Sequence, residues 1–136
     1  MSFRLAFDQK HSYEHDRDQW IQVPVRLFVN DRSLLVTATL DTGSEFCVFE
    51  RKCGELLGLD VEAGPTINFQ TMAGRFPAHE HTVTLETCGI SFECTVYFAQ
   101  DYGVKRSFLG RNGWLDHFRL AIVHYDRELF LSPYQS

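Results

Sequence analysis

One acidic residue at the end of an apolar run constrains the fold of this chain more than any other feature. Residues 34–40 are apolar or β-branched and contain neither glycine nor proline, which predicts a largely buried β-strand. Asp41 follows directly, and Gly43 lets the main chain turn sharply behind it. A carboxylate in such a place is stable only where neighbouring groups donate hydrogen bonds to it. The sequence therefore predicts a strand that delivers an acid into a tight turn rich in donors.

Two hydroxyl side chains flank the glycine of this turn. Thr42 and Ser44 can each donate and accept a hydrogen bond beside the Asp41 carboxylate. We expect the Ser44 hydroxyl to donate to the outer carboxylate oxygen and so to favour the ionised acid. An acid with donors around it and apolar walls behind it is suited to proton transfer. The alternative is an aspartate that only hydrogen-bonds within its own turn.

The remaining segments predict an all-β domain with one or two short helices. Strands are indicated where apolar and β-branched residues alternate or run together, over residues 3–7, 21–29, 46–49, 66–70, 76–85, 90–98, 120–125 and 128–131. Residues 30–33 are typical of a turn, so residues 21–29 and 34–40 should form a hairpin that leads to Asp41. Residues 10–19 are polar and indicate an exposed connection.

Two further patterns follow along the chain. Residues 50–57 indicate a short helix that ends at Gly58. The strands after it are joined by Thr71-Met72-Ala73-Gly74-Arg75, a hairpin with small residues and a glycine at its tip. Later, Phe108-Leu109-Gly110-Arg111 places two apolar residues before a glycine and an arginine, and a short helical segment follows.

Together these patterns resemble the retropepsin-like aspartic protease family. Asp41-Thr42-Gly43-Ser44 matches the family's D-T-G-[SA] signature, and Phe108-Leu109-Gly110-Arg111 matches its second signature. The resemblance covers most of residues 21–131 and implies one lobe of an acid-protease barrel, closed or partly open. One D-T-G and 136 residues correspond to a single domain over residues 1–136.

The resemblance also assigns roles to individual residues. It implies a catalytic group made of Asp41, Thr42 and Gly43. It implies contacts to substrate from Ser44, Glu45, Met72, Ala73, Gly74, Arg75 and Phe108, the glycine-tipped hairpin being the flap that closes over substrate. It implies structural support from Leu109, Gly110 and Arg111, with Arg111 paired to Glu45.

The activity implied is that of an endopeptidase that uses neither a metal nor another cofactor. In this family two carboxylates lie close together and share one proton, so that one is a base and the other an acid. A chain with one such Asp41 needs a homodimer to form the pair, and Thr42 would brace the two loops. The partners implied are a second copy and a peptide or protein substrate. The alternative is a catalytically inactive binding or assembly module with the same fold.

Charge and hydropathy limit the classes of partner that are expected. The chain has 13 basic and 18 acidic residues, a net charge of −5, which gives no electrostatic basis for binding nucleic acid. No segment has the apolar length of a membrane span, and residues 1–20 are charged rather than signal-like, which predicts a cytoplasmic protein and no membrane partner.

The cysteines and two of the histidines are interpreted as structural. Four cysteines follow no metal-binding spacing and are expected to be reduced, partly buried thiols: Cys47, Cys53, Cys88 and Cys94. His79 and His81 alternate along an expected strand, so they should share one face. Without a third ligand nearby, a solvated face is favoured over a metal site.

Overall fold

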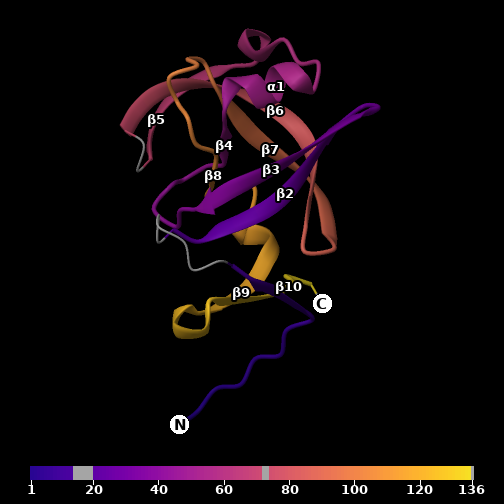
Figure 1. Ribbon diagram of the computed structural model, residues 1–136, viewed down its shortest axis with the longest axis vertical. Helices are drawn as coiled ribbons and strands as arrows, with labels where there is room; N and C mark the ends of the chain where they lie inside the picture. Colours follow the sequence, from indigo (N-terminus) through magenta and orange to yellow (C-terminus); the bar gives the residue numbers. More distant parts are fainter. Residues whose placement is uncertain (14–19, 72–73, 136) are drawn as a thin grey trace.

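The computed structural model describes residues 1–13, 20–71 and 74–135 and is built mainly from β-strands (Figure 1). In chain order, with η marking 3₁₀-helices, the elements are β1 (Gln9–Ser12), β2 (Gln22–Val29), β3 (Arg32–Leu40), β4 (Val48–Phe49), α1 (Arg51–Leu56), η1 (Val61–Ala63), β5 (Thr66–Thr71), β6 (Gly74–Thr87), β7 (Ile90–Ala99), β8 (Phe108–Leu109), η2 (Leu115–His117), β9 (Phe118–Val123), η3 (His124–Asp126) and β10 (Glu128–Pro133). The prediction of an all-β fold with little helix is confirmed.

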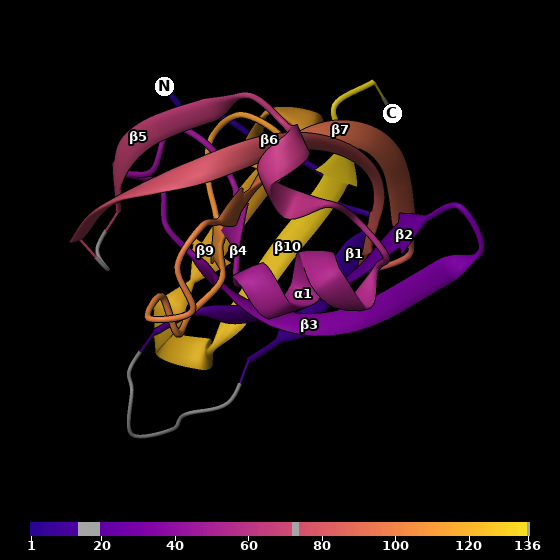
Figure 2. The same ribbon diagram turned by 90° about the horizontal axis from the view of Figure 1, so that it is seen from above.

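Seven strands form a nearly closed sheet. Their order is β2-β3-β8-β4-β7-β6-β5, and β2 also pairs with β6 through Arg26–Phe28. The extra pairing joins the two ends of a six-stranded ring and leaves β5 outside it, against the far part of β6. Two pairs, β3 with β8 and β4 with β7, run parallel, and the others are antiparallel. Figure 2 shows the curved strands from above, with α1 beside β3.

The hairpin of β2 and β3 leads to Asp41 as the sequence predicted. Eight residue pairs join the strands, and Asn30 turns the chain with a φ of 53°.

The prediction that residues 34–40 are largely buried is wrong for their first half: Leu35 is 58% exposed, and only the last three residues of β3 are buried. The reason is strand alternation: Leu34 and Val36 pack against the core, whereas Leu35 and Thr37 lie on the opposite, exposed face.

The second sheet lies below the ring in Figure 1 and has the order β1-β10-β9. Its hairpin of β9 and β10 confirms the predicted closing hairpin. The prediction of a strand over residues 3–7 is wrong, because the strand spans Gln9–Ser12 and so lies mostly in the segment expected to be an exposed connection. If the β1–β10 register continues, Phe7 lies opposite Pro133, which has no N–H to donate, and Phe3 is 86% exposed.

The main hydrophobic core joins the two sheets. Fully buried side chains from the ring pack with Leu129 and Leu131 of β10 and with Trp114, which precedes η2. A smaller buried cluster contains Phe108 and neighbours from β4, β6 and β7. The helix α1 begins at Arg51 and is followed by Gly58 at a φ of 80°, as predicted. Among the described residues, no helix has the length and apolar character needed to cross a bilayer.

Candidate active site

Main-chain hydrogen bonds hold Asp41 from two sides at the end of β3. The Asp41 N–H donates to the carbonyl of Leu109 over 2.9 Å, and the Leu40 N–H donates to the carbonyl of Ile21 over 2.8 Å. The parallel pairing of Leu40 with Leu109 continues this ladder toward the acid. The apolar pair of the second sequence pattern therefore lies directly beside the acid.

The turn after Asp41 closes on the acid itself. The Ser44 N–H donates to the Asp41 carbonyl over 3.0 Å, and the Gly43 N–H donates to Asp41 Oδ1 over 3.0 Å. A Cβ atom on Gly43 would lie 3.2 Å from that same oxygen, so glycine suits this close approach. Asp41 is half-buried, whereas Thr42 and Gly43 are exposed at the tip of the turn. The carboxylate is thus oriented by the main chain while the tip faces outward.

The Ser44 hydroxyl differs from its predicted role. Ser44 is fully buried, and its Oγ donates to the carbonyl of Phe46 over 2.7 Å. A hydroxyl has one proton to donate, so it does not also donate to the Asp41 carboxylate. The expectation that Ser44 favours the ionised acid is therefore corrected: the side chain stabilises the turn that follows.

The segment after β8 passes directly beneath this turn. The Arg111 N–H donates to the Ser44 carbonyl over 2.9 Å, and the Asn112 N–H donates to the Glu45 carbonyl over 2.8 Å. Gly110 makes this approach possible: a Cβ there would lie 2.3 Å from the Phe46 carbonyl oxygen. The second sequence pattern is thus a main-chain support for the first.

A buried thiol completes the support. Cys47 Sγ accepts a hydrogen bond from the Gly110 N–H over 3.3 Å and donates to the Asn112 carbonyl over 3.7 Å. Burial raises the pKa of the Cys47 thiol to about 12, so it is neutral and unreactive at ordinary pH. All four cysteines are free thiols, as predicted.

The structure differs from two of the predicted roles, the substrate contact of Phe108 and the Glu45–Arg111 pair. Phe108 is fully buried among apolar side chains and supports the fold from inside. The side chains of Glu45 and Arg111 are exposed and form no ion pair with each other. Gly74 and Arg75 begin β6, and Met72 and Ala73 lie outside the described residues.

A polar cavity of about 360 Å³ lies beside the turn. It is open to solvent and is bordered by the D-T-G turn, the segment after β8 and the hairpin of β5 and β6. This hairpin projects at the left of the molecule in both Figure 1 and Figure 2. Its lining residues all lack apolar side chains: Gly43, Glu45, Asn68, Gln70, Arg75 and Arg111. The sequence patterns did not indicate Asn68 and Gln70, because only the pairing of β5 with β6 brings them there.

The two strand histidines are not on a solvated face, which corrects that prediction. His79 is buried; its Nδ1 donates to the Gly64 carbonyl over 3.0 Å and its Nε2 lies 3.0 Å from Gln100 Oε1. His81 is half-buried, with Nε2 2.8 Å from the Val61 carbonyl. Segments distant in sequence cover both rings. In the described part of the chain, no group of three or more potential metal ligands was found.

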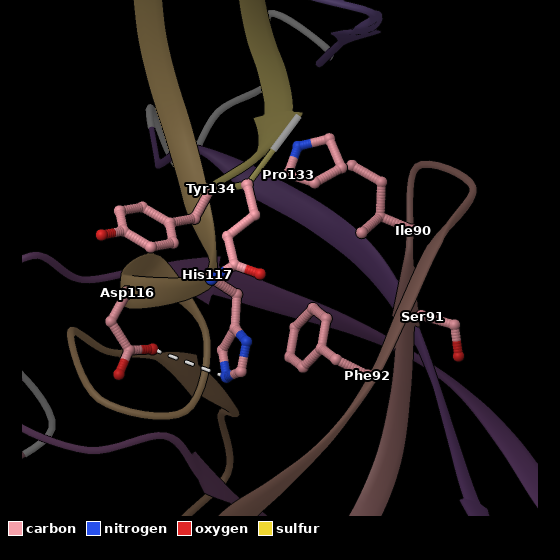
Figure 3. A pocket seen from close by; sticks show the side chains of 8 residues that line it. Ile90, Ser91, Phe92, Asp116, His117, Pro133 and Tyr134 are labelled. Carbon is pink, nitrogen blue, oxygen red and sulfur yellow. Dashed lines mark ion pairs between the residues drawn. The ribbon is translucent and has the colours of Figure 1, made fainter.

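A second cavity, of about 350 Å³, lies between η2, the start of β7 and the end of β10 (Figure 3). His117 stacks on Phe92 with ring centres 3.9 Å apart, and its Nε2 is 3.7 Å from Asp116 Oδ1. Ser91 points away from His117 in Figure 3, so these residues do not form a serine–histidine–aspartate arrangement.

Comparisons with known proteins agree with this arrangement. A family model described as aspartyl protease matches residues 23–112, which include both sequence patterns. A retropepsin-like aspartic protease from Rickettsia conorii is similar in structure, with 21% identity and a TM-score of 0.64, over 90% of this chain and 98% of that one.

EIAV protease, solved in complex with the inhibitor HBY-793, is similar with 19% identity and a TM-score of 0.52, over 74% of this chain and 88% of that one. At these identities the two structures establish the fold, and they confirm the predicted retropepsin-like lobe. A search of curated proteins gave no match.

Proposed function

Because this chain belongs to the aspartyl protease family, we propose that it is an endopeptidase whose acid–base pair is Asp41 and the Asp41 of a second copy. The observation that carries the proposal is the turn itself. One Asp41 oxygen is held by the Gly43 N–H, and the main chain of Asp41 is fixed by β8. A carboxylate oriented in this way is ready to accept or donate a proton without reorganisation.

The exposed tip of the turn supports a site completed by a second copy. Thr42 is exposed, and its hydroxyl makes no hydrogen bond with any other described residue. A hydroxyl at the tip can therefore bond to the matching turn of a partner related by a two-fold axis. Two carboxylates brought together in this way share one proton, an arrangement for which aspartic proteases are the established example.

The reaction then follows from the shared proton. The ionised carboxylate removes a proton from water, whose oxygen forms a bond to the carbonyl carbon of the peptide, while the protonated carboxyl gives its proton to the carbonyl oxygen. The tetrahedral diol then collapses: the C–N bond breaks, the leaving nitrogen takes the proton held by the pair, and one diol hydroxyl gives its proton to the other carboxylate as the C=O bond re-forms. The products are a free carboxyl and a free amine, and the pair again holds one proton.

The test is cleavage of a peptide library, over a range of pH and with and without pepstatin, by the wild type and by Asp41→Asn. The variant keeps the size of the side chain but has no ionisable pair, so cleavage should fall to background while the fold is retained. Cleavage by Asp41→Asn at the wild-type rate would remove Asp41 from the mechanism.

A mixed dimer tests whether each site needs an Asp41 from both copies of the chain. One wild-type subunit and one Asp41→Asn subunit, carrying different tags and purified together, should have background activity, since each site needs both acids. Wild-type homodimers carried through the same purification are the control. A chain that cleaves fully as a monomer would contradict the shared site, and a dimer without cleavage would favour the inactive binding module.

A further inference from the structure

The polar cavity beside Asp41 contains more positive than negative charge. Arg75 and Arg111 line it together with the carboxylate of Glu45, so that two guanidinium groups face one acid. The carboxylate of Asp41 adjoins the cavity through Gly43 but is not among the lining residues, so the excess of positive charge belongs to the lining itself. A negatively charged group in the cavity therefore has two guanidinium groups in the lining with which it can pair.

The two arginines are positioned by main chain while their side chains stay available. Arg75 is opposite Gln70 in the hairpin of β5 and β6, and the main chain of Arg111 is fixed by its bond to Ser44. Both side chains are exposed, and neither guanidinium forms an ion pair or hydrogen bond with another described residue. Their donors are thus free for a ligand.

The other lining groups favour the same kind of ligand. Asn68 and Gln70 contribute side-chain amides, which can donate to an oxygen. The fork of a guanidinium matches the two oxygens of a carboxylate. An apolar side chain would instead have to displace water from charged groups without replacing their hydrogen bonds, which is unfavourable.

We propose that this cavity is a substrate subsite for an acidic side chain, glutamate or aspartate, read by Arg75 and Arg111. The inference rests on the proposed function, because the cavity adjoins the D-T-G turn and would receive a substrate residue close to the bond that is cleaved. It adds the class of substrate: a peptide with an acid at one fixed distance from the scissile bond.

The experiment separates binding from cleavage. Asp41→Asn is incubated with peptide pools that are random except at one fixed position, which carries Glu, Asp, Gln or Lys in turn, and the bound peptides are quantified by mass spectrometry. At one position Glu and Asp should be enriched about fivefold to tenfold over Gln, with Lys depleted, as expected for charge-assisted hydrogen bonds weakened by solvent. The enrichment should shrink at high salt.

Substitutions of the two arginines test whether they cause the preference for acidic peptides. Arg75→Gln combined with Arg111→Gln, in the same Asp41→Asn background, should abolish the preference, whereas Arg75→Lys with Arg111→Lys should retain part of it. Lys52→Gln, which removes one exposed positive charge from α1, should leave the preference unchanged.

The outcomes are distinct for the two proposals. Equal binding of the Glu and Gln pools at every position, or a preference that persists in the double glutamine variant, would overturn the acidic subsite. Failure of the wild type to cleave any peptide would overturn the protease proposal, and a retained preference for acids would still support the subsite.

Discussion

Gly110→Ala should damage the support beneath Asp41 more than any other single methyl group added at the site. The new Cβ would lie 2.3 Å from the Phe46 carbonyl oxygen, 2.6 Å from its carbon and 2.8 Å from the Ser44 carbonyl oxygen. All three atoms belong to the main chain, so no side-chain rotation relieves the overlap. Ordinary contact begins near 3.4 Å, so the two segments must separate by about 1 Å.

That separation has a cost that can be worked out from the structure. The bonds from Arg111 to Ser44 and from Asn112 to Glu45 are 2.9 and 2.8 Å long. Lengthened by about 1 Å they cease to be hydrogen bonds, which costs about 1 kcal/mol each. Strain from overpacking adds about 1–3 kcal/mol. We expect the free energy of unfolding to fall by about 3–5 kcal/mol, which lowers the Tm by about 10–17 °C in a domain of this size.

Alanine substitutions at two other glycines serve as controls, because they distinguish a loss of stability from a displacement of Asp41. Gly103→Ala adds the same methyl group where no atom lies within 4 Å, and should be neutral. Gly64→Ala places a Cβ 1.9 Å from the Glu80 carbonyl oxygen, away from the acid, and should be destabilising without moving Asp41. Unfolding is followed by thermal and urea denaturation, and peptide cleavage is measured at a temperature where every variant is folded.

The expected pattern is loss of cleavage in Gly110→Ala beyond its loss of folded protein, and cleavage in proportion to folded protein in Gly64→Ala. A Gly110→Ala protein within 1 kcal/mol of wild-type stability and with full cleavage would refute the reasoning. It would mean that the two segments are loose enough to part without moving the acid.

Two further predictions concern the Ser44 hydroxyl and the buried thiols. Ser44→Ala removes the 2.7 Å bond to the Phe46 carbonyl and should lower the free energy of unfolding by about 1–2 kcal/mol, whereas the exposed Ser91→Ala should change it little; equal urea midpoints would contradict this role. Burial raises the pKa of the Cys47 and Cys94 thiols from 9.0 to about 12. Between pH 9 and 12 the unfolded chain loses these protons while the folded chain keeps them, so stability should fall as pH rises, by up to about 1.4 kcal/mol per pH unit for each thiol. Cys94→Ala should reduce that slope, and identical slopes would show that the thiol does not contribute.

The sequence could predict the acid, its turn and the hairpins because those features depend on neighbouring residues. The strand before Asp41 is indicated by its own β-branched residues, and the turn after Asp41 is permitted by Gly43 alone. Neither feature requires a contact with a distant segment. The β2–β3 hairpin, which ends in that turn, likewise needs only its own alternation and its turn residues.

Side-chain partners were not predictable in the same way. The Ser44 hydroxyl bonds to Phe46 rather than to the acid because the chain folds back two residues later. His79 is buried by contacts 15 and 21 residues away in sequence. The His79 contacts depend on the register of distant segments, and the Ser44 bond depends on the exact path of the turn; local alternation contains neither.

The support of the acid by main chain has a consequence for how a shared site can form. The bonds that fix Asp41 and its turn come from Leu109, Arg111 and Asn112 of the same chain, so the turn has its shape before any partner binds. If a second copy completes the site, as we propose, association need not reorganise the acid, and little binding energy is lost in ordering it. The strength of the dimer is then set by the surfaces around Thr42 and beyond it, whereas the geometry of the acid is set within each chain. Weakening the dimer should therefore lower the amount of active protein without changing the rate of each site.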